Sequence, residues 1–118
     1  MLSRVGACIF AFGACNAPAF YSPANAETAA DLSHHCSADL TKANYGTGRC
    51  VGYVEAVVDE LSEKQVMAKK KLFCPSSTVT NLDIIKAVRI FLDENRDQRN
   101  VPAHILVEYA LRVKFPCR

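Results

Sequence analysis

This chain lacks a strong excess of positive or negative charge: it has 14 basic and 12 acidic residues and a net charge of +2 at pH 7. Domains that bind nucleic acid present a strongly basic surface, so this balance argues against nucleic acid as a partner. A long hydrophobic run is missing as well. The apolar stretch at residues 5–14 has about half of the ~20 residues that a spanning helix needs, and we expect no membrane span.

The motifs of familiar catalytic and metal sites are also absent. The chain has no glycine-rich phosphate loop, no metalloprotease motif and no Cys-x-x-Cys pair, and no nucleophile–base arrangement is apparent. His34 and His35 precede Cys36, but adjacent side chains on a helix point about 100° apart and do not readily share one ion. We therefore predict that the protein is not an enzyme, with no catalytic residue, no metal and no cofactor.

The N-terminus has the order of regions found in secretory signal peptides. Arg4 supplies one positive charge, residues 5–14 are apolar, and Ala24-Asn25-Ala26 offers a small-x-small cleavage site. We expect cleavage after Ala26, export to the periplasm and a single mature domain at residues 27–118.

A lipid anchor is the competing interpretation of this leader. Residues 11–15 resemble a bacterial lipobox, which would make Cys15 a lipidated N-terminus. Phe12 stands where leucine is usual in such a motif, so cleavage after Ala26 is favoured.

The mature chain keeps four cysteines, Cys36, Cys50, Cys74 and Cys117. An even number in a small exported domain indicates two disulfides, which matter because the core of so small a domain is marginal. Zinc is the alternative, disfavoured by export and by the lack of a Cys-x-x-Cys pair. Three pairings are possible. Cys50 at the start of a predicted helix weakly favours Cys50–Cys74, which leaves Cys36–Cys117 to clamp the last helix to the first.

Hydrophobic periodicity predicts an all-α domain of four helices with short connections. The helices are expected over residues 27–43, 49–61, 80–95 and 102–114. Residues 44–48 are interpreted as a break. Residues 62–79 are interpreted as a connection, with room for an additional short helix.

The apolar stripes of these helices identify the expected core. They are Ala30, His34 and Ala38; Val51, Val54, Val57, Val58 and Leu61; Ile84, Ile85, Val88, Phe91 and Leu92; and Ala103, Leu106, Val107, Ala110 and Leu111. Thr80 and Asp83 have the spacing of a capping box, and Asn100 is expected to cap the fourth helix. Gly52 is expected to mark the close approach of another backbone or of a disulfide.

Several short motifs occur in a fixed order along the chain. They are Cys36, CVGYVEAVVD at 50–59, FCP at 73–75, VTNLDIIKAVRIFLDEN at 79–95 and PAHILVEYALRVKFPC at 102–117. This order resembles the Rap/Tai group of type VI secretion immunity proteins, over most of the mature chain. The resemblance implies a small helical periplasmic protein, often a homodimer. Such proteins bind a peptidoglycan amidase effector and occlude its active-site cleft with a projecting segment.

The resemblance also divides the chain into scaffold and contact surface. The matched motif positions look like scaffold: Cys50, Gly52, Tyr53, Val54, Asp59, Cys74, Pro75, Ala103, Ala110, Leu111, Phe115, Pro116 and Cys117. Partner-reading residues are therefore expected in two variable connections. The candidates are Asn95, Arg96, Asp97, Gln98, Arg99 and Asn100 in the polar loop, and Lys69, Lys70 and Lys71 in the basic connection. Residues 95–97 depart from a His-Pro-Glu-like step of the family.

Two other functions remain open on the residues alone. A periplasmic acid-stress chaperone of the Hde type is also small, helical and disulfide-bonded, and it would loosen at low pH, where carboxylates lose charge and histidines gain it. A structural envelope protein without a dedicated enzyme partner is the third interpretation.

Overall fold

The computed structural model describes residues 26–118, which form four α-helices and one 3-10 turn. The helices are α2 (Ala29–Cys36), α3 (Tyr45–Ala68), α4 (Asn81–Glu94) and α5 (Ala103–Lys114), with η1 (Arg96–Gln98) between the last two. The predicted all-α, four-helix domain is confirmed, but the extra short helix is η1 and does not lie in the connection at 62–79 where it was expected. The predicted leader, with Cys15, lies outside the described residues except for Ala26.

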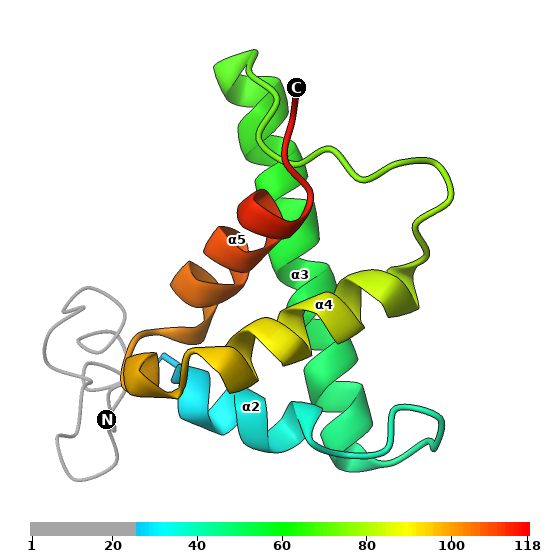
Figure 1. The fold of residues 1–118 in the computed structure, drawn as a ribbon, viewed down its shortest axis with the longest axis vertical. Coiled ribbons are helices and arrows are strands. Elements are labelled where there is room, and N and C mark those ends of the chain that lie inside the picture. The colour runs from blue at the N-terminus through cyan, green and yellow to red at the C-terminus, as the bar shows by residue number, and fades with distance from the viewer. Residues whose placement is uncertain (1–25) are drawn as a thin grey trace, which may run out of the picture.

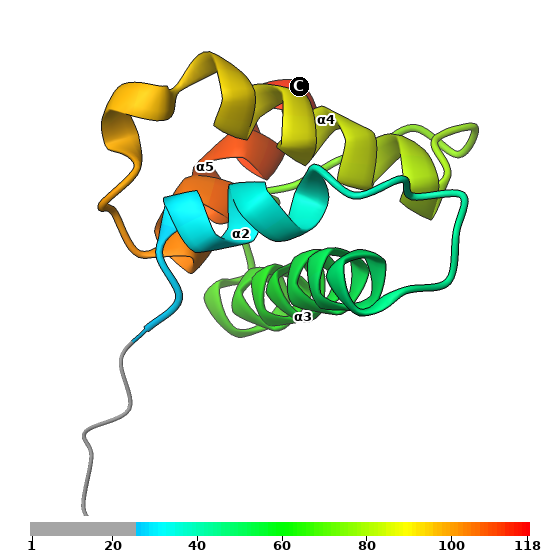
Figure 2. The same ribbon diagram turned by 90° about the horizontal axis from the view of Figure 1, so that it is seen from below.

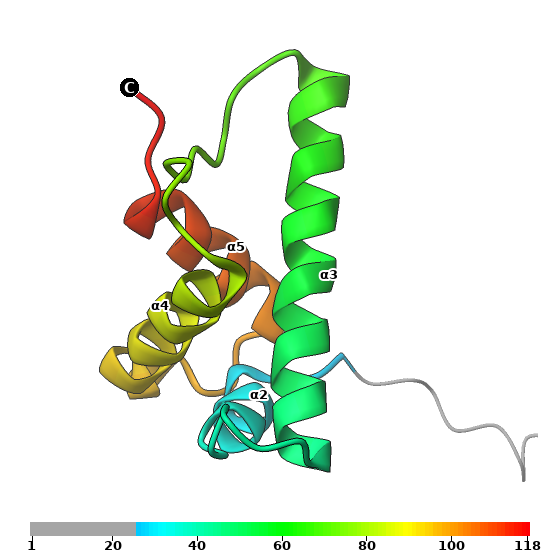
Figure 3. The ribbon, with the colours of Figure 1, turned by 90° about the vertical axis from the view of Figure 1, so that its right-hand side faces the viewer.

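One long helix, α3, forms the spine of the fold, and the three other α-helices pack along one side of it (Figure 3). Helix α2 crosses near the start of α3, while α4 and α5 cross its middle (Figure 1). The last turns of α3 rise beyond all three (Figure 3). The opening segment is fastened to the start of α5, because Ala103 N–H donates to the Glu27 carbonyl at 2.7 Å and Thr28 forms an isolated β-bridge with Pro102 (Figure 2).

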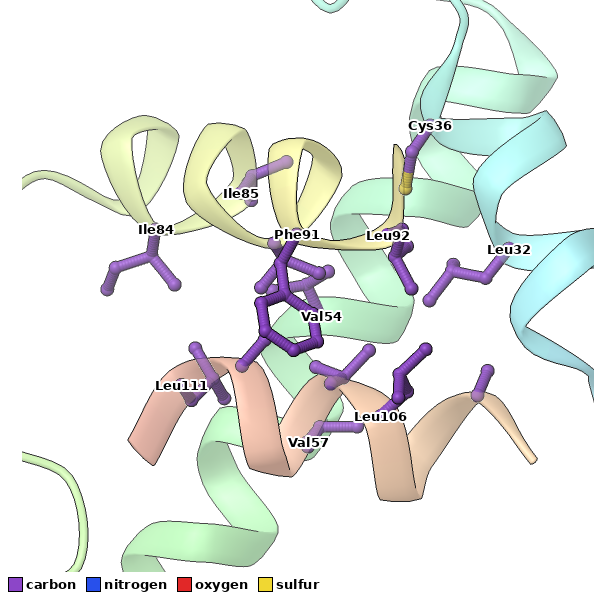
Figure 4. Packing of buried hydrophobic residues seen from close by; sticks show 14 of the residues in the cluster. Leu32, Cys36, Val54, Val57, Ile84, Ile85, Phe91, Leu92, Leu106 and Leu111 are labelled. Carbon is purple, nitrogen blue, oxygen red and sulfur yellow. The ribbon is translucent and has the colours of Figure 1, made fainter. Parts of the chain in front are cut away.

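Within residues 26–118 the core is wholly apolar (Figure 4). The stripes predicted for residues 80–95 and 102–114 are confirmed in full, since all ten named side chains are buried. On α3 the side chains of Val54, Val57 and Leu61 are buried, whereas Val51 and Val58 are only partly buried against the core. These faces follow the 3.6-residue period of a helix.

The face predicted for the first helix is wrong. Helix α2 buries Ala29, Leu32 and Cys36, not His34, which is exposed. The reason is that Leu32 is the one large apolar side chain of this helix, and the free energy of burial grows with apolar area. Its position therefore decides which side of α2 faces α3.

The break predicted at residues 44–48 is the start of α3. Asn44 is its N-cap, with the side-chain oxygen accepting from the Thr47 N–H at 2.9 Å. Gly46 lies where a Cβ would come within 3.2 Å of the Ala38 Cβ, so a glycine lets the preceding loop pack closely. The close approach expected at Gly52 is wrong, since a Cβ there would meet nothing within 4 Å.

Helix α3 also continues seven residues past its predicted end, to Ala68, so residues 62–68 are helix and not connection. Its C-cap is Lys69, which has a left-handed backbone with φ of 50°. At the next helix, the predicted capping box is confirmed, because Thr80 Oγ1 accepts from the Asp83 N–H and Asp83 Oδ2 accepts from the Thr80 N–H. Hydrogen bonds from the Thr80 side chain and backbone hold the pKa of Asp83 below its usual value.

The cap predicted for α5 is wrong. Pro102, not Asn100, is the N-cap residue, and it makes no side-chain capping bond. The Ala103 N–H instead donates to the Glu27 carbonyl. A distant backbone segment thus satisfies a helix-end donor that a side chain satisfies elsewhere.

The four cysteines form two disulfides as expected, but both favoured pairs are wrong. The bonds are Cys36–Cys50 and Cys74–Cys117. Because α3 begins at Tyr45, Cys50 lies inside the helix and faces the end of α2, where Cys36 is its neighbour. With sequence separations of 14 and 43 residues, the chain-entropy model assigns the bonds about 3 and about 4 kcal/mol.

The assigned core predicts that the same change, valine to alanine, lowers the free energy of unfolding much more at a buried position than at an exposed one. Val107 is fully buried on α5, whereas Val66 is 76% exposed on α3. Val107→Ala should lower the free energy of unfolding by roughly 2–3 kcal/mol, because it leaves a cavity. Val66→Ala should change it by less than about 0.5 kcal/mol. Urea unfolding of the oxidised proteins measures both, and equal effects would contradict the assigned core.

The two disulfides should differ in their rate of reduction. Cys36 and Cys50 are fully buried, while Cys74 and Cys117 are partly exposed. Thiol–disulfide exchange requires access to a sulfur atom, so a limiting thiol reductant should open Cys74–Cys117 first in the native protein. Alkylation of the released thiols followed by peptide mass analysis gives the order. Earlier release of Cys36 and Cys50 would contradict it.

Candidate functional site

The two segments predicted to contact a partner lie at separate ends of the molecule. Residues 95–100 lie at the end of α4, beside the start of α2, and residues 69–71 lie at the far end of α3 (Figure 1). The structure therefore does not bring them together into one surface, and each is described in turn.

The loop at 95–100 holds one structural residue and several exposed ones. Asn95 ends α4: its N–H donates to the carbonyl of Phe91, and its side-chain Nδ2 donates to the same carbonyl at 2.8 Å. Gln98 Nε2 donates to Asp97 Oδ2 at 3.1 Å. The exposed members of this loop are Arg96, Asp97, Gln98, Arg99 and Asn100. Asn95 is thus better explained as a helix terminator than as a contact residue.

A small hollow of about 240 Å³ lies beside this loop. Its lining residues are Ala29, Ala30, Ser33, Leu92, Asn95, Arg96 and Arg99. Arg96 lies 3.8 Å from Asp93, and both side chains are exposed. An exposed ion pair of this kind contributes little to stability, so the Arg96 guanidinium is available to an acidic group. The hollow therefore combines an apolar floor with two cationic side chains at its rim.

The second candidate surface is the part of the molecule that projects beyond the core. We call residues 62–71 the α3 tip. Val66 and Met67 are 76% and 78% exposed, the highest values among the exposed large apolar side chains of the described chain. Lys69, Lys70 and Lys71 follow directly and are exposed. Sequence reasoning missed the apolar pair because it ended the helix at Leu61.

A detectable signal for this pair was present in the sequence. Val66 and Met67 are adjacent apolar residues within a run of charged and polar ones. The buried stripe at Val57 and Leu61 would continue at positions 64, 65 and 68, so Val66 and Met67 fall between its three- and four-residue steps.

An ion pair connects the base of the α3 tip to α5. Lys64 Nζ donates to Glu108 Oε2 at 2.8 Å and lies 3.1 Å from Glu60 Oε1. The hydrogen bond to Glu108, with that to Glu60, raises the pKa of Lys64 above its usual value. Lys64 was expected in a loose connection, and the structure places it at a helix–helix contact.

The return segment after the α3 tip is held in three ways. Gln65 Oε1 accepts from the N–H groups of Leu72 and Phe73, at 2.7 and 2.8 Å. The Phe73 ring is buried and packs edge-on against Phe115, with ring centroids 5.6 Å apart. Cys74 N–H donates to the Phe115 carbonyl at 3.0 Å, next to the Cys74–Cys117 disulfide. The tip is therefore presented by an ordered base.

These contacts leave an open hollow of about 640 Å³ on the side of the α3 tip. Its lining residues are Gln65, Val66, Lys69, Lys70, Lys71, Phe73, Cys74 and Pro75. Three lysines around apolar side chains suit an acidic surface that also carries an apolar group. This hollow is larger and more open to solvent than the one beside Arg96.

A third surface feature lies on α5. Ile105, Tyr109 and Val113 recur every four residues and are about half exposed. The Tyr109 ring lies against Phe91 of α4, with centroids 5.8 Å apart. Exposed apolar stripes of this kind commonly mark an interaction surface.

Neither a metal cluster nor a membrane span is found in the described part of the chain. Residues 26–118 contain no group of three or more His, Cys, Asp or Glu side chains placed to hold a metal ion. In the same range, no helix has both the length and the apolar character needed to cross a membrane. His34 is exposed, and its ring lies 5.8 Å from that of His35 at an angle of 60°.

Comparison with known proteins gives one match. A family model described as Rap1a immunity proteins matches residues 28–117, which is more than half of the chain. No curated protein and no solved structure matches. The match begins at the segment that docks on α5 and ends at Cys117, so it covers all four α-helices and both disulfides. The chain therefore belongs to the family of Rap1a immunity proteins, and this membership indicates a non-enzymatic inhibitor of a secreted effector.

Proposed function

We propose that this protein is exported to the periplasm, where it binds and blocks a peptidoglycan amidase delivered by type VI secretion. Family membership supports the role of an immunity protein. The two disulfides are consistent with an exported protein, because such bonds persist in oxidising compartments. The amidase target follows from the resemblance to the Rap/Tai group.

The α3 tip is the surface that we propose for contact with the effector. The main support is that the projecting end of α3 exposes Val66 and Met67 beside three lysines. The base of this end is held by Gln65, Lys64 and a disulfide. An ordered base reduces the entropy lost on binding. A projecting apolar and cationic end is the shape needed to enter a cleft with acidic groups at its mouth.

The backbone of Lys69 adds an independent argument. Lys69 has φ of 50° at the C-cap of α3, a position where glycine is the usual residue. A side chain there costs about 1 kcal/mol relative to glycine. A lysine that lowers stability at an exposed position is consistent with a role in binding.

The function itself is tested with oxidised residues 27–118. The protein, tagged at its C-terminus, is used to capture partners from periplasmic extract and from the secreted fraction, and the captured protein is assayed on purified peptidoglycan. We expect one amidase whose release of cleaved muropeptides stops near equimolar inhibitor. Undiminished cleavage with excess inhibitor would reject the proposal. Retention of many unrelated proteins only at acid pH would favour the chaperone instead.

Replacing Lys69 by glycine separates binding from folding. Lys69→Gly should raise the free energy of unfolding by roughly 0.5–1 kcal/mol, because the left-handed backbone is relieved. It should also weaken binding of the captured amidase roughly fivefold or more, because a cation near an acidic surface is lost. Titration calorimetry and urea unfolding measure the two effects.

The matched control is Lys42→Ala, which removes a lysine from the loop between α2 and α3. Lys42 is exposed and lies 3.8 Å from Asp39, so its loss should leave affinity unchanged. If Lys69→Gly and Lys42→Ala bind equally well, the α3 tip is not the contact surface.

The loop at 95–100 is the alternative contact surface. Replacing Arg96 and Arg99 by alanine removes both cations from the hollow of about 240 Å³. If this loop contacts the effector, we expect roughly a tenfold loss of affinity with little change in the free energy of unfolding. Unchanged affinity would remove the loop from the contact surface and leave the α3 tip.

A homodimer is a further part of the proposal. It is supported by the resemblance and by the exposed stripe Ile105, Tyr109 and Val113 on α5. That stripe lies on α5, whereas the exposed apolar pair of the α3 tip, Val66 and Met67, lies on α3.

A further inference from the structure

A cluster of charged side chains near the start of the domain is not explained by the proposed inhibitor role. Glu27 precedes α2, His35 lies on α2 and Arg49 lies on α3. Arg49 Nη2 donates to Glu27 Oε2, and His35 Nε2 lies 3.9 Å from Glu27 Oε1. The Glu27 side chain is only 10% exposed. The cluster thus holds a largely buried carboxylate against two elements of the core.

One oxygen of this carboxylate is unsatisfied. Glu27 Oε1 is buried and has no hydrogen-bond partner among the described residues, and the 3.9 Å to His35 exceeds hydrogen-bonding distance. A buried acceptor that lacks a partner costs about 1–3 kcal/mol, and more when it is charged. A donor is therefore expected at this oxygen.

The Glu27 residue contributes to the lining of an open hollow of about 550 Å³. Its lining residues are Ala26, Glu27, Asp31, His35, Arg49 and Tyr53. Acidic groups from two segments line it, while the Arg49 guanidinium is already engaged by Oε2. The missing donor is best supplied by a compact cation with several N–H groups, which is the chemistry of a primary ammonium.

The position of Ala26 at this hollow points to the source of that ammonium. Hydrolysis of the Ala26–Glu27 peptide bond adds one water: the Ala26 carbonyl carbon becomes a carboxylate, and the Glu27 nitrogen becomes an ammonium. We propose that signal cleavage after Ala26 creates an α-ammonium site at Glu27, which occupies this hollow and completes the Glu27–His35–Arg49 cluster. The inference rests on the proposed export, but not on any effector.

The fold holds this new terminus in place. The Glu27 carbonyl accepts from Ala103 N–H at 2.7 Å, Thr28 pairs with Pro102, and Ala29 N–H donates to the Val101 carbonyl at 2.8 Å. The backbone of Glu27 is therefore fixed on α5 while its side chain is fixed on α3. The ammonium then belongs to the residue that carries the unsatisfied oxygen, so little additional chain entropy is lost in pairing them.

The charge environment sets the expected pH dependence. Glu27 and Asp31 favour the ammonium, while His35 and Arg49 oppose it, and Tyr53 lines the same hollow. The adjacent carboxylate should raise the pKa of the α-amine in the folded protein above its usual ~7.7–8.0. A raised folded pKa means that the stabilisation is fully present below pH ~7.7 and is lost as the pH rises through the folded value.

The test is a double-mutant cycle on the isolated domain. Protein recovered from the periplasm is first sequenced from its N-terminus and should begin at Glu27. Unfolding by urea at pH 7 is then compared for the free-amine and Nα-acetylated forms, each with Glu27 and with Glu27→Gln. Acetylation should raise the unfolding equilibrium constant roughly three- to tenfold with Glu27, and much less in the Glu27→Gln background.

A direct titration keeps the proposal testable even if Glu27→Gln does not fold. The pKa of the α-amine, followed by NMR in the unmodified protein, should lie above the usual range. A different first residue, an equal effect of acetylation in both backgrounds, or an α-amine pKa at or below ~7.7 would overturn the proposal. A lysine of a partner as the true donor would show as weaker amidase binding in Glu27→Gln without any effect of acetylation, which also overturns it.

Discussion

The burial of one side of α3 is the constraint on which the rest of the structure depends. Cys50, Val54, Val57 and Leu61 form a single stripe, and α2, α4 and α5 all pack against it. Because no buried polar residue contributes to this core within residues 26–118, its cohesion comes from apolar burial and from the disulfide at Cys50. Helix α2 packs most extensively on α3, whereas α4 and α5 also pack extensively on each other.

Helix α3 is longer than its buried stripe. The stripe ends at Leu61, yet the helix continues to Ala68. These extra turns add no buried apolar side chain to α3, and they place Val66 and Met67 in solvent. Lys64, Gln65 and the Cys74–Cys117 disulfide hold the base of this extension. The molecule thus separates a core that stabilises the fold from a projecting end that is available to a partner.

The beginning and the end of the domain are secured by comparable means. The segment at Glu27 and Thr28 docks on the start of α5, and the segment after α5 is tied to Cys74. Backbone hydrogen bonds therefore fasten the N-terminal segment to the start of α5, and a covalent bond fastens the C-terminal segment to the connection between α3 and α4. For an exported protein of this size, fastened ends limit fraying and proteolytic attack.

The sequence by itself determined the all-α class, the buried faces of α4 and α5, the capping box at Thr80 and the oxidation of four cysteines. The first three rest on periodicity or spacing within one segment, which is local information, and the fourth rests on the even number of cysteines in a small domain expected to be exported. The tertiary structure alone decided the disulfide pairing, the buried face of α2 and the enclosure of Glu27. These depend on distances between residues far apart in the chain, such as Glu27 and Arg49 or Cys74 and Cys117, and only the packing of helices on α3 sets those distances.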